Sequence, residues 1–334
     1  MPAACLRGHG PASTHPHPEP IVSLFLLRRL GAGLVLVFVI ATATFFLTSV
    51  TGSDPARRIA GTQASAAQVI AKRHELGLDR PVLTRYTDWL SHAVRGDLGT
   101  SWFSNQPVTG LVGQALPVSL SLVLAATVLT AAVSIVLGVV AAVRGGWVDH
   151  VLQSISIVAF AVPNFLVGMV LALLLAVELG LFPAVGYVPL AGDPAGWLAS
   201  ITLPSIALAV GAIATVASQT RGSMIDVLRQ DYVRTLRSRG LPVRSVLLKH
   251  ALRNAAPTSL TVLSLQFIAL IGGAVVIEKV FGLTGIGARA TSAASQGDVP
   301  LVLGIVVVTV VLVVVVNLLV DVVLGWLNPK VRIA

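Results

Sequence analysis

The chain has 334 residues, of which 55% are hydrophobic and only 11% are Asp, Glu, Lys or Arg. Soluble domains carry about 25% charged residues, so this composition excludes an ordinary soluble protein and indicates a membrane protein. The net charge of +9 suits either nucleic acid or an anionic membrane surface. Because the basic residues gather near the ends of apolar segments, they indicate a membrane lipid partner and no nucleic acid.

The first segment, residues 1–27, is rich in proline and histidine as far as Pro20, and residues 1–20 contain no apolar run. Such a segment cannot bury enough apolar surface to fold, so it is predicted to be a disordered tail. The single cysteine, Cys5, cannot form an internal disulfide. A secretory signal is not expected, because the first apolar run exceeds the about 7–15 residues of a signal core.

Six apolar stretches follow, each near or above the about 20 residues that a helix needs to cross a bilayer. They are Leu30–Val50, Leu111–Val143, Val151–Val177, Pro194–Thr220, Ala255–Ile277 and Val299–Val320. Hydrocarbon offers no partner to backbone amides, so all six are predicted to be helices, and the fold class is an all-α membrane protein with six transmembrane helices. Pro163 removes one backbone donor and is expected to kink the third span.

Lys and Arg in the short loops predict that both termini are cytoplasmic. Arg28 and Arg29 precede the first span, and Lys330 and Arg332 follow the last one, whereas the connection 181–193 has no basic residue. The chain then divides into four parts. These are the tail 1–27, the first span with an external region at 28–110, a five-helix core at 111–328, and a cytoplasmic end at 329–334.

The external stretch 51–110 is longer than a connector requires and has helical patterning of its own. Helices are predicted near Ala64–Leu76 and Pro81–Val94. The second places large side chains on one face, namely Tyr86, Trp89 and Leu90.

Motifs of covalent chemistry are missing from the sequence. It contains no G-x-x-x-x-G-K-[ST] phosphate loop, no H-E-x-x-H, no C-x-x-C and no G-x-S-x-G. The chain is therefore predicted to be no enzyme and to bind no cofactor or metal. The closely spaced glycines of Gly282–Gly287 follow a membrane span and not a strand, so a tight outer turn is expected there and not a dinucleotide site.

Polar side chains inside spans are costly in lipid, so each is a candidate for function. Asn164, Gln219 and Gln266 are candidates to line a path, although a hydrogen bond to a neighbouring helix is the commoner role of such residues. Glu278 and Asp321 lie at span ends, where water or headgroups are expected to reach them.

The connection Met224–Asn254 is basic and strongly patterned. It is predicted to form two cytoplasmic helices that meet at Gly240, with Pro242 in the first turn of the second helix. The apolar face of the first helix holds Ile225, Leu228, Tyr232 and Leu236. Local physics leaves two interpretations open: a helix that docks into the groove of a partner protein, or a basic segment that lies on anionic lipid.

The residues of this connection carry a family resemblance. Asp231-Tyr-Val-Arg-Thr-Leu-Arg-Ser-Arg-Gly240, followed ten residues later by His250-Ala-Leu-Arg-Asn254, resembles the EAA loop of ABC-importer permeases. The version found here is similar to that of the dipeptide/oligopeptide/nickel importers. The resemblance runs from about Leu26 to the C-terminus. It also includes Gly52-Ser-Asp-Pro55, Gly77-Leu-Asp-Arg-Pro81, Arg95-Gly-Asp-Leu-Gly99 and Glu278-Lys-Val-Phe-Gly-Leu-Thr-Gly-Ile-Gly287.

The resemblance implies a binding-protein-dependent permease with the type I ABC importer fold, in the cytoplasmic membrane of a prokaryote. It implies a coupling loop at 221–255 that contacts ATPase subunits. The residues carried over are Asp231, Tyr232, Arg234, Thr235, Leu236, Gly240, His250, Leu252 and Asn254. Leu236 departs from the family, which usually has a small alanine there. Residues 1–20 have no counterpart, so the tail is either disordered or a product of a mistaken start.

The implied partners are a second homologous permease subunit, usually forming a heterodimer, two cytoplasmic ATPase subunits and an external substrate-binding protein. ATP and Mg would be bound by the ATPase subunits. The expected solute is a small peptide or a related solute such as nickel.

The alternative is an ion-coupled secondary transporter, which requires acidic or histidine side chains near mid-membrane. The central parts of the spans lack acidic residues, which disfavours it. An intramembrane enzyme is disfavoured because no histidine lies inside a predicted span.

Overall fold

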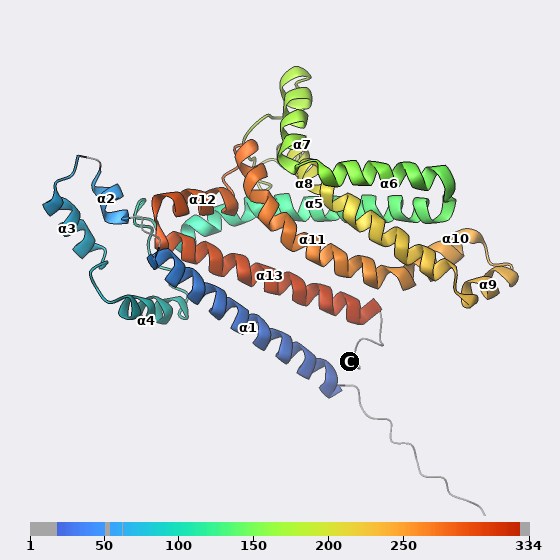
Figure 1. Ribbon diagram of the computed structural model, residues 1–334, viewed down its shortest axis with the longest axis horizontal. Helices are drawn as coiled ribbons and strands as arrows, with labels where there is room; N and C mark the ends of the chain where they lie inside the picture. The colour runs from blue at the N-terminus through green and yellow to red at the C-terminus, as the bar shows by residue number, and fades with distance from the viewer. Residues whose placement is uncertain (1–18, 51–53, 62, 328–334) are drawn as a thin grey trace, which may run out of the picture.

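The computed structural model describes residues 19–50, 54–61 and 63–327, and its regular elements in those ranges are all helices (Figure 1). The predicted all-α fold is therefore confirmed for the described part of the chain. The first helix begins at Glu19, so residues 19–27 belong to it and not to the predicted tail. Residues 1–18 of that tail and the predicted end 329–334 lie outside the described residues.

Five helices are long and apolar enough to cross a membrane, and they confirm five of the predicted spans. Their bounds are α1 Glu19–Val50, α5 Val108–Arg144, α8 Pro194–Leu228, α11 Leu252–Val280 and α13 Val299–Leu327. With 37 residues, α5 is roughly 55 Å long at the usual rise per residue, well beyond the hydrocarbon thickness of a bilayer. The ends of the longest helices therefore extend outside the lipid core.

The third predicted span, Val151–Val177, is broken and not merely kinked. It consists of α6, Gly146–Ala161, and α7, Asn164–Leu171, which continues as the π-helix η1, Ala172–Glu178. The two parts meet at 95°. Pro163 has no backbone N–H and forces Val162 into an extended conformation, with φ −81° and ψ 123°, so the helix cannot continue through this point. Beyond the break, α7 turns away from α6 (Figure 1).

The centre of the bundle is the contact between α5 and α8. In the most apolar part of α8, 61% of the residues are buried, far more than in any other span. A Cβ atom on Gly138 of α5 would lie 2.7 Å from the Cβ of Thr220 and 2.9 Å from the carbonyl oxygen of Ala217. Only glycine permits this separation of the two helices. Thr220 also donates a hydrogen bond to Ser259 of α11 at 3.0 Å, which joins a third helix to the pair.

The pair α1 and α13 packs side by side on one flank of the bundle (Figure 1). Near its cytoplasmic-predicted end, Arg29 forms an ion pair with Asp321 at 3.1 Å. Asp321 is thus partly accessible at its span end, as expected. Most of the remaining surface of α1 is exposed and apolar, as required of a helix that faces lipid or another membrane protein.

Three short helices precede α5 at the other end of the bundle: α2 Pro55–Ala60, α3 Ala66–Glu75 and α4 Val82–Ala93. The sequence predicted α3 and α4 but not α2. Ser65 and Gln68 form a capping box at the start of α3. On α4, Tyr86 packs edge-on against Phe45 of α1 with ring centroids 5.3 Å apart, which confirms its predicted apolar face.

A further helix at this end, α12, Ile286–Gln296, was not predicted. The turn that precedes α12 was predicted, and Gly282 adopts a φ of +60° in it. The remaining elements are α9 Asp231–Ser238, α10 Val243–Ser245 and the π-helix η2 Val246–Ala251, all at the opposite end of the bundle from α12 (Figure 1).

The expectation that water reaches Glu278 is wrong, because this residue is fully buried. One carboxylate oxygen accepts a hydrogen bond from Ser119 of α5 at 2.6 Å, and the other accepts one from the backbone N–H of Ala288 at 2.8 Å. Ser119 in turn accepts from the backbone N–H of Ile286 at 2.7 Å. The first turn of α12 therefore receives its acceptors from α11 and α5.

The glycines before and within this turn have a steric role. A Cβ on Gly285 would lie 2.3 Å from a carboxylate oxygen of Glu278, and a Cβ on Gly287 would lie 2.7 Å from a methyl group of Val275. The motif that ends at Gly287 thus lets the backbone approach the buried carboxylate closely.

We predict that Glu278→Ala destabilises the permease, because it leaves the Ser119 hydroxyl and the Ala288 N–H without their acceptor. Each unsatisfied buried donor costs about 1–3 kcal/mol. Thermal unfolding of the purified importer in detergent measures the effect. Glu278→Gln retains one acceptor oxygen and should be intermediate, whereas Glu75→Ala, at an exposed ion pair with Lys72, should change stability by less than about 0.5 kcal/mol. Equal stability of Glu278→Ala and the wild type would contradict this role.

Candidate functional site

The segment predicted to be the coupling loop, 221–255, begins inside α8 and ends inside α11. Between them lies α9, a helix of two turns. The predicted continuous apolar face is interrupted, because Ile225 and Leu228 belong to the end of α8, and an extended Gln230 separates them from Tyr232 on α9. Sequence periodicity missed this break because the apolar spacing continues across the turn.

The end of α9 confirms the predicted conformation of Gly240 at a helix end, since this residue has a φ of +77°. Its N–H donates to the carbonyl of Arg237 at 3.0 Å, and the N–H of Leu241 donates to the carbonyl of Leu236 at 3.3 Å. These two bonds form a Schellman motif, in which a residue with positive φ satisfies the last carbonyls of the helix. The direction in which the chain leaves α9 is thereby fixed.

The second cytoplasmic helix differs from the prediction in two ways. Pro242 is the extended residue before the helix and does not lie in its first turn. From Val243 to Val280 the chain forms one uninterrupted helical rod of α10, η2 and α11. The predicted second helix is thus the beginning of the fifth span, so any movement of this segment is transmitted to a membrane helix.

Side chains on one face of α9 anchor it to the two spans. Val233 is fully buried, and Tyr232 packs against a buried cluster that includes Met224 of α8 and Ala251 of η2. The hydroxyl of Tyr232 accepts a hydrogen bond from the Asn254 side chain of α11 at 2.8 Å. The structure therefore brings together two of the predicted residues, Tyr232 and Asn254. It adds Val233, which the sequence analysis did not select because Val233 lies off the face assigned to a longer helix.

Some of the other predicted residues lie beside the contact of Tyr232 with Asn254, and the rest lie on the outer surface. His250 and Leu252 are half-buried, and the carbonyl of His250 accepts a second hydrogen bond from the Asn254 side chain at 3.0 Å. The exposed residues are Asp231, Arg234, Thr235 and Gly240, and Leu236 is half-buried. The ion pair of Asp231 and Arg234 is 3.5 Å long and almost fully exposed, so it contributes little to stability.

A large hollow lies along α5, with a volume of about 1300 Å³. Its walls come from α5, the connection 186–191, the start of α8 and the turn at Gly282. No charged side chain lines it among the described residues. It is a groove on the surface of the chain and not a closed cavity.

The polar groups of the hollow are neutral hydrogen-bonding side chains. Ser121 of α5 accepts from the indole N–H of Trp197 at 3.1 Å and lies 3.1 Å from the hydroxyl of Tyr187. The two hydroxyls have two hydrogens, and the contact between them uses one. One hydroxyl hydrogen therefore remains available at the wall of the hollow for an acceptor on a solute.

The three predicted path-lining residues, Asn164, Gln219 and Gln266, do not line this hollow. The amide of Asn164 donates a hydrogen bond to the carbonyl of Leu208 on α8 at 3.4 Å. This bond joins two helices, which is the commoner role of a polar side chain inside a span. Gln219 and Gln266 are half-buried on α8 and α11. Contact of these three side chains with a solute stays a prediction.

Comparison with known proteins relates the whole chain to transport permeases. The family model described as "Binding-protein-dependent transport system inner membrane component" matches residues 134–333, and the model of the corresponding N-terminal region matches residues 22–123. A putative peptide transport system permease of Brucella melitensis is 40% identical over 313 residues, which cover 93% of this chain and 99% of the relative.

Other relatives match over a similar length. A probable peptide ABC transporter permease of Sinorhizobium fredii is 35% identical, covering 93% of this chain and 100% of the relative. A glutathione transport system permease of Escherichia coli is 34% identical, covering 92% of this chain and 98% of the relative. The similarity therefore includes both the spans and the segment that contains α9.

Proposed function

Since the chain belongs to the family of binding-protein-dependent transport system inner membrane components, and is thus a permease subunit of a bacterial ABC importer, we propose that it conducts small peptides. The family makes the chain a transport subunit of the inner membrane and not an enzyme, and the secondary-transporter alternative is not favoured. Peptide and glutathione transport in the names of relatives supports this class of solute, since glutathione is itself a small peptide.

The hollow along α5 is the part of the structure that best supports a peptide path. Peptides share a backbone with hydrogen-bond acceptors but differ in the charge of their side chains. A wide, uncharged wall with a free hydroxyl donor, from Ser121 or Tyr187, contacts the shared backbone without selecting for side-chain charge. Because the hollow is open on one side, we propose that a second homologous permease subunit, in a heterodimer, supplies the opposite wall.

We further propose that α9 is the contact for cytoplasmic ATPase subunits, with an external substrate-binding protein delivering solute at the other end. The observation that carries this is the attachment of α9 to α8 and α11 through Tyr232, which packs against the buried cluster containing Met224 and receives a hydrogen bond from Asn254. A partner that moves α9 thereby moves two spans. A segment that served only to lie on anionic lipid would not require this anchoring.

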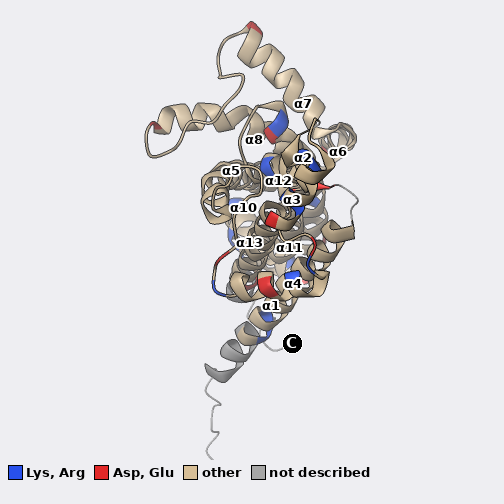
Figure 2. Ribbon diagram, turned by 90° about the vertical axis from the view of Figure 1, so that its left-hand side faces the viewer, with Lys and Arg blue, Asp and Glu red and all other residues tan. Residues whose placement is uncertain are grey.

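The proposed orientation places both termini and α9 in the cytoplasm. The basic residues of the short loops support it. The bundle has distinct ends, since α9 lies at the end opposite α2, α3 and α12 (Figure 1). Seen from the latter end, acidic and basic residues both appear on the short helices (Figure 2). Mixed charge on a long external segment is compatible with this topology, because long segments translocate largely regardless of charge.

Transport tests the proposed function directly. The importer is reconstituted in proteoliposomes, with ATP on the side of the ATPase subunits and the binding protein on the opposite side. Small peptides such as trialanine and glutathione should then accumulate on the side that contains ATP. Vesicles without the binding protein should accumulate neither, because delivery depends on it. Uptake of nickel or sugars without any peptide uptake would exclude peptides as the solute while leaving the family assignment intact.

Cysteine labelling tests the orientation. In a Cys5→Ser background, Val94→Cys, at a site 81% exposed beside α4, should react with an impermeant thiol reagent in intact spheroplasts. Ser238→Cys on α9 should react only after lysis. The reverse pattern would show that the chain is inverted.

Substitution of Gly240 tests the coupling role. Gly240→Val should release the ATPase subunits or uncouple hydrolysis from transport, since a β-branched residue at this φ costs roughly 1–2 kcal/mol and would redirect the chain after α9. Gly240→Asn is the matched control, because asparagine tolerates the left-handed region, and it should retain most coupling. The measurement is ATPase co-purification together with solute-stimulated ATP hydrolysis. Normal coupling in Gly240→Val would favour the lipid-surface interpretation of α9.

A further inference from the structure

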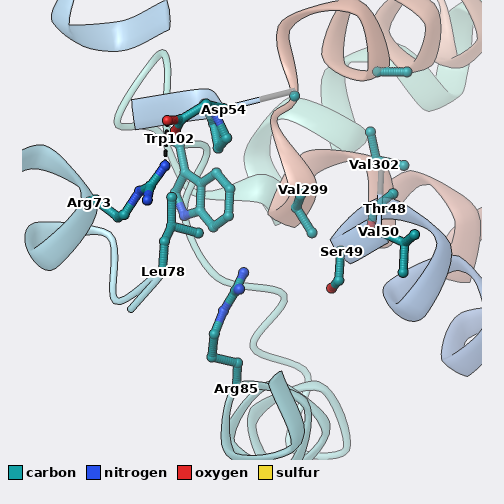
Figure 3. Close-up of a pocket in the computed structure, with 13 residues that line it drawn as sticks. Thr48, Ser49, Val50, Asp54, Arg73, Leu78, Arg85, Trp102, Val299 and Val302 are labelled. Carbon is teal, nitrogen blue, oxygen red and sulfur yellow. Dashed lines mark hydrogen bonds and ion pairs between the residues drawn. The ribbon is translucent and has the colours of Figure 1, made fainter. Parts of the chain in front are cut away.

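A second cavity lies at the outer-predicted end of the bundle, where α1 ends and α13 begins. Its volume is about 390 Å³, within the range of about 300–1,000 Å³ that is typical of small-molecule sites. Side chains from α3, α4 and the Trp102 loop face into it together with the ends of the two spans (Figure 3). It shares no lining residue with the hollow along α5, so it is a separate feature.

Among the described residues, three charged side chains line this cavity, and two of them neutralise each other. Arg73 binds Asp54 at 2.6 Å. Arg85 of α4 extends into the cavity from below (Figure 3), and its guanidinium has no hydrogen bond or ion pair with any described residue. The three groups together carry a net charge of +1, all of it attributable to Arg85.

The Arg85 side chain is half-buried, and this burial lowers its pKa from the ordinary value. A guanidinium nevertheless remains protonated in proteins, so the group stays a cation with five N–H donors. A partly desolvated charge without a partner is unfavourable. An anion that accepts two N–H bonds at once relieves this, and phosphate and carboxylate both have that geometry.

The surroundings of the guanidinium favour one of these anions. Leu78, Trp102 and Val302 give the cavity an apolar wall. At its mouth, Val50 is 83% exposed at the end of α1, and Phe46 one turn earlier is 40% exposed. An apolar surface thus continues from the cavity along the outside of the bundle, at the level where membrane spans end and lipid phosphates lie.

We propose that this cavity binds the headgroup of a membrane phospholipid, with the phosphate on Arg85 and the glycerol and upper acyl carbons against Trp102, Val302 and the exposed face of α1. The bound lipid joins the external helices α3 and α4 to the outer ends of α1 and α13. A peptide carboxylate fits less well, because the cavity lies on the flank formed by α1 and α13 and not in the hollow along α5.

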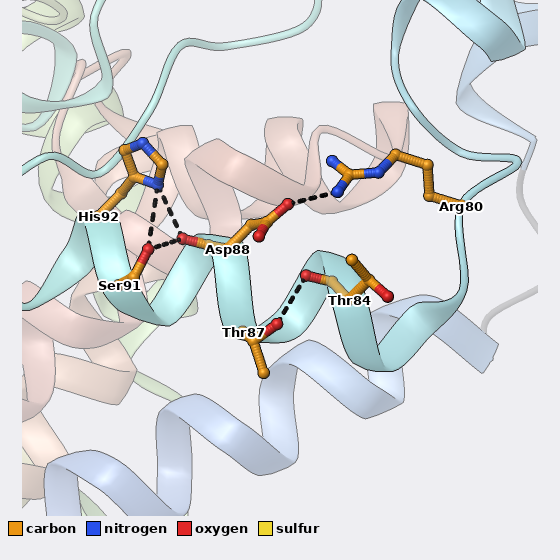
Figure 4. Close-up of polar contacts among 6 residues, drawn as sticks. All are labelled: Arg80, Thr84, Thr87, Asp88, Ser91 and His92. Carbon is orange, nitrogen blue, oxygen red and sulfur yellow. Dashed lines mark hydrogen bonds and ion pairs between the residues drawn. The ribbon is translucent and has the colours of Figure 1, made fainter.

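A neighbouring arginine provides a matched control. Arg80 precedes α4 on the same external segment and binds Asp88 at 2.7 Å (Figure 4). Its side chain is 52% exposed and does not line the cavity. Arg80→Gln therefore removes the same charge as Arg85→Gln from the same region while leaving the proposed lipid site intact.

Native mass spectrometry of the purified importer in detergent tests the proposal, with phosphatidylglycerol as the probe. Arg85→Gln should weaken binding of the tightest phosphatidylglycerol by about tenfold or more, as expected for loss of a charge-assisted pair. Arg80→Gln should retain wild-type affinity, and Arg85→Lys should be intermediate because it keeps the charge but loses the planar fork. Diacylglycerol, which lacks the phosphate, should not occupy the site.

Thermal unfolding of the same samples separates lipid binding from folding. Phosphatidylglycerol should raise the unfolding temperature of the wild type and of Arg80→Gln but not of Arg85→Gln, whose lipid-free stability should be no lower than that of the wild type. Equal phosphatidylglycerol affinity in the wild type and Arg85→Gln would overturn the proposal. So would displacement of the lipid by millimolar inorganic phosphate or by trialanine, since the site would then serve a soluble anion.

Discussion

The close approach of α5 and α8 is the constraint on which the described bundle depends. In lipid, apolar side chains gain little by leaving a solvent that is itself apolar, so helices associate through close packing of small residues. Gly138 allows the backbone of α5 to reach Thr220 and Ala217, and no larger residue fits there. From this contact α8 extends to α9 at one end, and α5 supplies the wall of the hollow and Ser119 at the other.

Buried carboxylates organise the end of the bundle that carries α12. Glu278 accepts from Ser119 and from the first turn of α12. Asp298, which is also buried, follows α12 and accepts from Ser101 and from the backbone N–H of Trp102. Both acids receive hydrogen bonds from neutral donors, so α12 is held at each end by groups that tolerate no loss of a partner. The start and the end of α12 are accordingly fixed in position.

A single rod connects this fixed end to the segment that we propose to contact the ATPase subunits. The helix from Val243 to Val280 includes Asn254, which holds Tyr232 of α9, and ends near Glu278, which holds α12. Energy released at a partner subunit needs a stiff element to act on a distant path. In the described part of the chain the rod is such an element, and specific hydrogen bonds at both of its ends add to its apolar packing.

The sequence by itself determined the helices and helix ends that depend only on residues close together along the chain. Apolar length specified five of the spans, because lipid leaves the backbone no alternative to a helix. Gly240 specified a left-handed helix end, and the spacing of Tyr86 specified the packed face of α4. The family motifs specified the candidate loop.

Only the tertiary structure decided features that depend on distant partners. It placed Glu278 in the interior, where the carboxylate accepts from Ser119 and from the first turn of α12. The sequence could not predict this burial, because Ser119 lies far from Glu278 along the chain. The tertiary structure broke the third span at Pro163, where neighbouring helices must accommodate a 95° bend that composition does not record. It divided the patterned loop at Gln230 and buried Val233. It also left Arg85 without a partner among the described residues, since pairing of charges depends on which helices meet and not on their order along the chain.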